Sequence, residues 1–273
     1  MTQLQNAVVL ITGAAGGFGQ ELTRQLLAAN SRLILTDLNA KQLYDQGRSL
    51  QAQLKTGEIL GCIAADLASS EGCDRLYKAV QALGHPVDIV INNAGIGLYG
   101  RMDEIPAEKW DRLMQVNLLA PMHLSALFMA DMIARRQGHI VNISSLAGWL
   151  TTAGMAHYSA SKYGLRGFSE GLAQELKPHN VKVTAVYPYF SRTPILQAER
   201  FGSLAKGTEG FPPEMATDPA KVMQATLRGV ERDRLHVFPD QFARSIHFLL
   251  RYSPEFLHWI STVTTRRLQQ RGQ

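Results

Sequence analysis

Residues 7–19 read Ala7-Val-Val-Leu-Ile-Thr-Gly13-Ala-Ala-Gly-Gly-Phe-Gly19, an apolar run that ends in a glycine-rich turn. The apolar, partly β-branched part is typical of a buried parallel strand. The next segment, Glu21–Ala29, carries apolar residues at helical spacing. A strand, a glycine turn and a helix start together form a cradle whose backbone N–H groups and helix dipole face an anion. We therefore expect the pyrophosphate of a dinucleotide at this turn; a tight turn without a ligand is the alternative.

The next apolar run, Arg32–Thr36, ends in Asp37. An acidic side chain at this position can accept hydrogen bonds from both ribose hydroxyls of an adenosine, and it would repel a 2′-phosphate. Because neither Leu38 nor Gly16 is basic, the sequence predicts a preference for NAD(H), with NADP(H) as the alternative. A second interpretation makes Asp37 the N-cap of a helix that begins near Asn39.

Short apolar runs alternate with helical patterns along the chain, which predicts a parallel sheet with helices on both faces. The chain has 273 residues, 45% of them hydrophobic, and no linker or repeat divides it, so we expect one main domain over residues 1–240. The remaining predicted strands are Gly61–Ala65, Val87–Ile91, His139–Ser144, Val181–Tyr187 and a short seventh strand, Leu235–Phe238.

Tyr158 and Lys162 are four residues apart, and Ser145 precedes Tyr158 by thirteen residues. Residues i and i+4 share one face of a helix. A nearby cation stabilises a phenolate and lowers its pKa from ~10 toward the range that general acid–base catalysis needs at neutral pH. The spacing therefore predicts a proton-transfer pair; an exposed tyrosine–lysine pair on a helix surface is the alternative.

Taken together, these motifs resemble the short-chain dehydrogenase/reductase family over about Val8 to Thr193. The spacing of Gly13, Gly17 and Gly19 is similar to that family's cofactor signature. Further family landmarks follow in order: Asp66-Leu67, Asn92-Asn-Ala-Gly95, Asn117, Ser145, Tyr158 and Lys162. The resemblance implies an α/β fold with a single Rossmann-type doubly wound parallel sheet that binds a nicotinamide dinucleotide.

The resemblance assigns catalytic roles to Asn117, Ser145, Tyr158 and Lys162. It implies that Ser145 holds the substrate carbonyl and that Tyr158 exchanges a proton with the substrate oxygen. Lys162 would lower the pKa of Tyr158 and bind the nicotinamide ribose, while Asn117 would hold a water of a proton relay. Taken alone, an asparagine within a helix favours a local packing role for Asn117, and Ser144 is the nearest competitor of Ser145.

The resemblance also implies a set of cofactor-binding residues. Asp66 and the Leu67 amide are expected at the adenine and Asn93 to Gly95 at a ribose, although Asn92-Asn93 also suits an ordinary turn after a strand. The full set is Gly13, Gly17, Phe18, Gly19, Asp37, Asp66, Leu67, Asn93, Ala94, Gly95, Tyr158, Lys162, Pro188, Ser191 and Thr193. No metal is expected, since the eight histidines show no ligand spacing and Cys62 and Cys73 are predicted core thiols.

One departure from the family pattern follows the sixth predicted strand, where the family usually has Pro-Gly and this chain has Pro188-Tyr189. Tyr189 lacks the positive-φ freedom of glycine, and we expect its ring to form an aromatic wall near the substrate. A rebuilt loop with unchanged function is the alternative. Residues 189–216 resemble the family's substrate lid, and their apolar composition predicts a lipophilic substrate.

A second departure is the C-terminal extension, residues 241–273. Its five arginines and one glutamate give it a net charge of +4, out of +5 for the whole chain. We expect a basic amphipathic helical tail that packs on the same domain or at a subunit interface; contact with an anionic membrane surface is the alternative. The apolar residues of the two predicted helix faces are Phe242, Ile246, Leu249 and Leu250, then Phe256, Leu257, Ile260 and Val263.

The sequence therefore predicts an NAD(H)-dependent oxidoreductase that acts on a secondary alcohol or ketone. The alternatives are an NADPH-dependent carbonyl reductase and a catalytically idle cofactor sensor or scaffold, which the complete catalytic set disfavours. We expect a cytoplasmic protein, because we find neither a signal peptide nor an apolar run of ~18 residues. No nucleic-acid partner is expected. The family often forms homodimers or homotetramers through the helices that contain residues 102–136 and 157–177.

Overall fold

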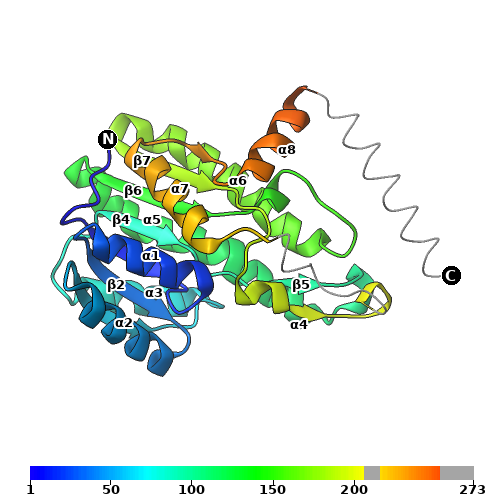
Figure 1. Cartoon of the computed structure of the whole chain (residues 1–273), viewed down its shortest axis with the longest axis horizontal. Helices are drawn as coiled ribbons and strands as arrows, with labels where there is room; N and C mark the ends of the chain where they lie inside the picture. Colours follow the sequence, from blue (N-terminus) through cyan, green and yellow to red (C-terminus); the bar gives the residue numbers. More distant parts are fainter. Residues whose placement is uncertain (206–215, 253–273) are drawn as a thin grey trace.

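The computed structural model describes residues 1–205 and 216–252. Its core is a sheet of seven parallel strands in the order β3-β2-β1-β4-β6-β7-β9 (Figure 1). The strands are β1 (Val8–Thr12), β2 (Arg32–Asp37), β3 (Glu58–Ala64), β4 (Ile89–Asn92), β6 (Gly138–Ile143), β7 (Val181–Val186) and β9 (His236–Val237). The strand order reverses direction between β1 and β4, which is where open α/β sheets bind ligands.

Helices cover both faces of the sheet, so the predicted doubly wound architecture is confirmed. One face carries α1 (Gly17–Ala28), α2 (Ala40–Leu54) and α7 (Pro219–Glu231). The other carries α3 (Ser70–Gln81), α5 (Ala120–Arg135) and α6 (Ala156–Leu176), with α4 (Ala107–Met114) packed beside α6.

The two cores form because side chains alternate across each strand. In β1, Val9 and Ile11 join the cluster under α1, whereas Val8 and Leu10 join the cluster under α3 and α5. Both cysteines belong to these clusters, as predicted, and burial raises the pKa of the Cys73 thiol to about 11.

Some elements differ from the prediction. β3 begins at Glu58, three residues before the predicted start, and two short strands, β5 (Leu98–Tyr99) and β8 (Glu199–Arg200), form a small parallel sheet. β8 belongs to the predicted lid, of which residues 206–215 lie outside the described residues. The shorter helical segments are Met102–Glu104, the π-helical turn Gln115–Leu119, Leu146–Gly148, Lys177–His179, Pro194–Gln197 and Ser203–Ala205.

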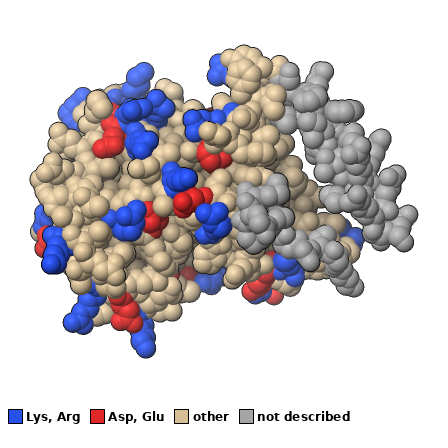
Figure 2. All heavy atoms as spheres, viewed as in Figure 1, with Lys and Arg blue, Asp and Glu red and all other residues tan. Residues whose placement is uncertain are grey.

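The C-terminal extension begins as the helix α8 (Gln241–Tyr252), which emerges at one side of the molecule (Figure 1). Its buried centre is Ala243, while the predicted face residues Ile246, Leu249 and Leu250 are half-buried and Phe242 is largely exposed. The second predicted face, from Phe256 to Val263, lies outside the described residues. Charged side chains of both signs are interspersed over the face of the molecule in Figure 2.

One helical stretch corrects the expectation that no segment could span a membrane. α4, the π-helical turn and α5 run on as Ala107–Arg135, which is long enough and, with a mean hydropathy of 1.4, apolar enough to do so. In this fold, however, 44% of the apolar window is buried, and Leu124, Phe128 and Met132 pack against the sheet. The composition of this helix is therefore accounted for by its place in the core.

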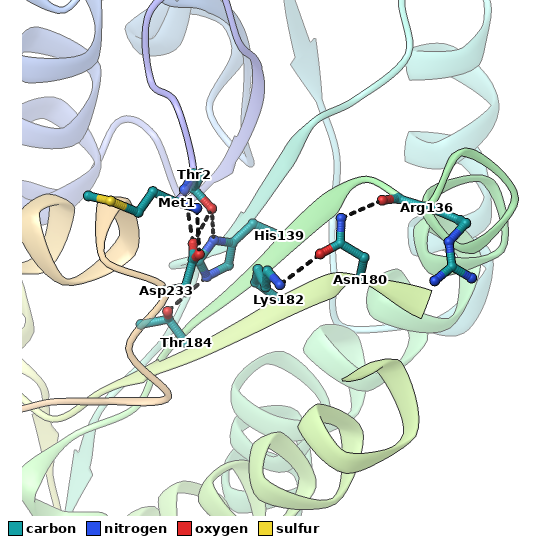
Figure 3. Close-up of polar contacts among 8 residues, drawn as sticks. All are labelled: Met1, Thr2, Arg136, His139, Asn180, Lys182, Thr184 and Asp233. Atoms are coloured by element: carbon teal, nitrogen blue, oxygen red, sulfur yellow. Dashed lines mark hydrogen bonds and ion pairs between the residues drawn. The ribbon is translucent and has the colours of Figure 1, made fainter. Parts of the chain in front are cut away.

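A buried polar network occupies the amino end of β6 (Figure 3). The imidazole of His139 lies 2.8 Å from the Thr2 hydroxyl at Nδ1 and 2.8 Å from the Thr184 hydroxyl at Nε2. The Thr2 hydroxyl and backbone N–H both donate to Asp233, which also pairs with the Met1 amine. Burial lowers the pKa of His139 to about 4. This network ties the residues before β1 to β6, β7 and the segment after α7.

Candidate active site

The glycine turn after β1 is packed too closely for side chains. Gly13 has φ +64°, and a Cβ there would lie 2.8 Å from the Cα of Ala94. A Cβ on Gly17 would lie 2.7 Å from the methyl carbon of Thr193. The helix α1 begins at Gly17, and the side chain of Phe18 packs against the core, so only backbone N–H groups can face a ligand here. The turn therefore fits a phosphate group held at a helix N-terminus.

Thr12 joins this turn to the loop after β4. Its hydroxyl oxygen accepts from the backbone N–H groups of Asn93 at 3.0 Å and Ala94 at 2.9 Å. The amide of Asn93 donates in return to the carbonyls of Thr12 and Gly13. Sequence reasoning missed Thr12, although a hydroxyl residue at the end of an apolar strand was a readable signal. The structure thus brings the predicted residues Gly13, Asn93 and Ala94 together.

Asp37 closes the turn from the end of β2. Its Oδ2 accepts from Ala15 N at 2.9 Å and its Oδ1 from Leu38 N at 2.7 Å. The interpretation of Asp37 as a helix cap is wrong, because the side chain of Asn39 caps α2 by accepting from Gln42 N at 3.1 Å. A carboxylate is therefore held beside the glycine turn.

Asp66 and Leu67 follow β3 along the same sheet edge. The Oδ1 of Asp66 accepts from Ala68 N at 3.0 Å and lies 3.2 Å from the guanidinium of Arg112. Arg112, which comes from α4, is not among the residues predicted from the sequence. Because this ion pair is exposed, it contributes little to stability. Leu67 is buried in the core beneath α3 and α5.

Ser145 follows the carboxyl end of β6 and faces Tyr158 of α6. The Ser145 hydroxyl lowers the pKa of the Tyr158 phenol, and Ser145 Oγ accepts from Ala147 N at 3.1 Å. The competing residue, Ser144, is turned away, since its hydroxyl donates to the carbonyl of Lys162 at 3.0 Å. The geometry therefore selects Ser145 over Ser144 as the partner of Tyr158.

Lys162 lies one turn after Tyr158 and is buried. Its Nζ donates to the Ile143 carbonyl at 3.0 Å and lies 5.7 Å from the centre of the Tyr158 ring. Burial lowers the pKa of Lys162 to about 8. A Cβ added to Gly95 would lie 3.7 Å from this Nζ, which places the loop after β4 beside the ammonium group.

The predicted lowering of the Tyr158 pKa by Lys162 is wrong for this structure. Burial raises the pKa of Tyr158 to about 12, and the interaction with Ser145 offsets only part of that rise. The phenol packs in an apolar cluster with Leu98, Ile105 and Leu113, which disfavours a phenolate. The ammonium group is meanwhile directed at a β6 carbonyl. The proton-transfer pair is thus present as a neutral phenol beside a cation.

Asn117 lies in the π-helical turn between α4 and α5, fully buried. Its Oδ1 accepts from Ile96 N at 2.8 Å, and its Nδ2 donates to Ile96 O at 2.9 Å and to Ser161 Oγ at 3.4 Å. The side chain therefore clamps the loop that follows Gly95, which supports the packing interpretation. The proton relay stays a prediction. Such π-turns occur frequently at functional sites.

The loop after β7 reaches across to the glycine turn. The Pro188 carbonyl accepts from Leu146 N at 2.9 Å, next to the Ser145 loop. Ser191 is buried, and its hydroxyl lies 2.7 Å from the Thr217 hydroxyl. Thr193 lies against Gly17. The glycine turn and the loops after β4, β6 and β7 therefore lie together along one edge of the sheet. Among residues 1–205 and 216–252, no group of three or more His, Cys, Asp or Glu side chains could hold a metal.

Known proteins are similar to this chain in sequence and in fold. A family model described as short chain dehydrogenase matches residues 7–202. Dehydrogenase/reductase SDR family member 7B from Mus musculus is 30% identical over 265 residues, which cover 91% of this chain and 77% of that protein. The 3-ketodihydrosphingosine reductase from Bos taurus is 32% identical over 193 residues, covering 70% of this chain and 58% of the relative.

A solved structure extends the likeness to three dimensions. A short-chain dehydrogenase from Sphingobium yanoikuyae in complex with NADPH has a TM-score of 0.78 and 25% sequence identity, and the match covers 92% of this chain and 95% of that one. The family model spans more than half of the chain and includes the glycine turn, Ser145, Tyr158 and Lys162. The protein therefore belongs to the short-chain dehydrogenase family and is an oxidoreductase.

Proposed function

We propose that the protein reduces a lipophilic ketone, or oxidises the corresponding secondary alcohol, with NAD(H) as the cofactor. The observation that supports this proposal is the placement of Ser145, after the end of β6, with Tyr158 and Lys162, on the same sheet edge as the glycine turn. A bound nicotinamide dinucleotide would supply the hydride-transfer chemistry. The close packing around Gly13 and Gly17 fits its pyrophosphate.

Each catalytic side chain has a defined task in this proposal. Ser145 orients the substrate oxygen by donating a hydrogen bond. Tyr158 exchanges a proton with that oxygen, and its raised pKa keeps the phenol protonated at neutral pH, as reduction of a ketone requires. An ammonium group carries three donors, and Ile143 O uses one of those of Lys162. The others are available to the nicotinamide ribose.

The preference for NAD(H) is supported by Asp37, whose carboxylate beside the glycine turn would repel a 2′-phosphate. The observation in favour of NADPH is the solved structure of the short-chain dehydrogenase from Sphingobium yanoikuyae, which is in complex with NADPH. An NADPH-dependent reductase is therefore the second candidate function. Comparison of kcat/KM for NADH and NADPH with the same ketone tests the choice: a ratio in favour of NADPH contradicts our preference.

The apolar character of the substrate is supported by the surroundings of Tyr158. Its ring packs in an apolar cluster. The buried members are Leu98, Ile105 and Leu113, and Ile96, Trp110 and Phe201 pack against them. One relative is named 3-ketodihydrosphingosine reductase, after a lipid ketone. We expect kcat/KM to rise with chain length in a series of aliphatic ketones. A preference for short polar ketones contradicts this substrate class.

The tests of catalysis itself use Tyr158→Phe, since a cofactor sensor or scaffold would keep its function without the phenol. Loss of turnover with retained nucleotide binding supports the enzyme. Retained turnover contradicts it.

We further propose a cytoplasmic homo-oligomer that pairs through α5 and α6. Leu119 at the end of the π-helical turn, Met122 on α5 and Tyr163 on α6 are exposed apolar side chains and would be covered by a second copy. Light scattering after size-exclusion chromatography tests this: a monomer at micromolar concentration contradicts it.

We also propose that α8 touches anionic membrane surfaces. Its outer side carries Phe248, 62% exposed, and Tyr252, 64% exposed, whose rings lie 4.6 Å apart, together with Arg244 and Arg251. Aromatic and basic side chains on one helix face suit an anionic lipid interface. We expect cosedimentation with vesicles that contain phosphatidylserine, weakened by Phe248→Ser; equal binding of the variant contradicts the contact.

A further inference from the structure

Asp240 lies between β9 and α8 and is 9% exposed. Its two carboxylate oxygens have different partners. Oδ1 accepts from Ala243 N at 2.8 Å, which is the usual N-cap contact at the start of a helix. Oδ2 accepts from Tyr189 N at 3.0 Å, in the loop after β7. One carboxylate therefore joins the start of the C-terminal extension to a loop of the candidate active site.

The ring of Tyr189 makes a second connection to α8. It lies 4.1 Å from the ring of Phe242, measured between centroids. The two departures from the family pattern, Tyr189 and the C-terminal extension, are thus in direct contact. The same loop carries Ser191 and Thr193, and Thr193 lies against Gly17 of the glycine turn. The position of the start of α8 is therefore linked to the wall of the cofactor cradle.

Helix α8 also contacts the loop that carries Ser145. The ring of His247 lies 4.5 Å from Trp149 and is stacked at 4.1 Å on Phe238. Trp149 directly follows the short helix Leu146–Gly148 that begins after Ser145. The buried side of α8 therefore packs on both loops that border the catalytic pair.

A comparison with Asp218 separates capping from this wider role. Asp218 caps α7 through Oδ1, which accepts from Ala220 N at 3.0 Å. Among the described residues, no distant backbone N–H donates to Asp218, whereas Asp240 accepts from a residue 51 positions away. A cap needs only one oxygen. The contact between Asp240 Oδ2 and Tyr189 N therefore holds the loop after β7 and is not needed to cap α8.

We propose that Asp240 is a positioning residue. Its carboxylate holds the loop after β7 against the start of α8, and thereby sets the affinity of the site for the nicotinamide dinucleotide. This inference rests on the proposed function, which identifies that ligand. Ordering a loop before binding raises affinity because the free energy cost of ordering is removed from the binding step.

The substitution Asp240→Ser tests this coupling. Serine is as good an N-cap as aspartate, but it has no second oxygen at the position from which Asp240 Oδ2 accepts from Tyr189 N. Asp218→Ser is the matched control, since it makes the same change at a cap with no contact to the loop after β7 through its carboxylate. We expect Asp240→Ser to raise the Kd of NADH about tenfold, as measured by nucleotide fluorescence, while Asp218→Ser stays within about twofold of the wild type.

Each outcome decides the matter. An unchanged Kd in Asp240→Ser overturns the inference, even if its Tm falls, because a cap alone would lower only the Tm. Equal increases in both serine variants also overturn it. If Asp240→Ser does not fold, Phe242→Ala leaves the carboxylate in place, and a Kd raised about threefold supports the coupling, whereas an unchanged Kd overturns it. A wild-type protein that binds neither NADH nor NADPH overturns the proposed function itself.

Discussion

The two ends of the central sheet each bury an ionisable side chain, but they surround it differently. At the amino end, His139 lies among Thr2, Thr184 and Asp233, and both of its ring nitrogens have partners (Figure 3). At the carboxyl end, Ile143 O is the acceptor for the Lys162 ammonium group among the described residues. Burial lowers the pKa of both groups, to about 4 for His139 and about 8 for Lys162.

We interpret the cluster around His139 as structural and propose a catalytic role for the cluster around Lys162. Partners within the protein offset the cost of burial at His139, so this network stabilises the fold. Lys162 keeps donors that no described residue uses, and Tyr158 is a partly buried phenol whose pKa is lowered by the Ser145 hydroxyl and raised by burial. Active sites commonly retain such costly groups because function needs them. The following experiments break or sharpen this contrast, in order of expected effect.

The largest effect is expected from Tyr158→Phe. Loss of the proton donor should lower kcat about 1,000-fold or more, while the apolar cluster around the ring keeps the Tm close to that of the wild type. Tyr163→Phe, on the exposed side of the same helix, is the matched control and should retain full activity. Steady-state kinetics and thermal melts measure both. A kcat within tenfold of the wild type would mean that the polar cluster at the carboxyl end of the sheet has a structural role, like the cluster around His139.

Lys162→Met should lower kcat/KM about 100-fold without lowering the free energy of unfolding at pH 7. The folded-state pKa of about 8 lies below the ordinary 10.5, so the protonated side chain costs about 3 kcal/mol in the fold at neutral pH. Removal of this cost offsets the lost hydrogen bond to Ile143 O. Urea unfolding measures the balance. If the free energy of unfolding of Lys162→Met is lower than that of the wild type by more than the experimental error, Lys162 is a stabilising group, like His139.

Asp37→Ser should shift the ratio of kcat/KM for NADPH to that for NADH by about tenfold to 100-fold toward NADPH, because a charge that repels the 2′-phosphate is removed. Asp66→Ser, at the neighbouring strand end, is the control and should weaken both cofactors alike. If the NADPH-to-NADH ratio of kcat/KM is unchanged in both variants, Asp37 does not distinguish an adenosine ribose with a 2′-phosphate from one without it.

The smallest effect is expected at the amino end. Since the folded-state pKa of His139 lies below its ordinary 6.5, the unfolded chain binds more protons between pH 6.5 and 4. Stability contributed by neutral His139 is therefore complete above pH 6.5 and is lost as pH falls, by about 2 kcal/mol between pH 7.5 and 5. Urea unfolding at both pH values measures it, and His139→Gln should show a smaller difference.

The hydrogen-bond count at His139 provides a sharper check. The Thr2 hydroxyl also donates to Asp233, and the Thr184 hydroxyl to the Arg234 carbonyl, so four contacts share the protons of two hydroxyls and one imidazole. A neutral ring supplies one proton fewer than these contacts can use. A His139 pKa above 6.5 by NMR would mean that the network outweighs burial, and the pH dependence would reverse its sign.

Local patterns in the sequence determined much of this protein. The β1 strand, the glycine turn and the 3.6-residue periodicity of the helices are encoded within a few neighbouring residues, so the doubly wound fold could be predicted. The spacing of Tyr158 and Lys162 likewise placed them on one helix face, whereas Ser145 was assigned to Tyr158 through the family resemblance. The role of Thr12 could have been predicted in the same way.

Only the tertiary structure decided the rest. The pKa of Tyr158 depends on how much apolar surface distant segments pack around the phenol, and that burial outweighs the opposing interaction with Ser145. The clamp of Asn117 on Ile96 and the bond between Asp240 and Tyr189 join residues 21 and 51 positions apart. Hydrogen bonds and desolvation act through space over a few ångströms, so partners that are remote in the chain leave no periodic trace in it.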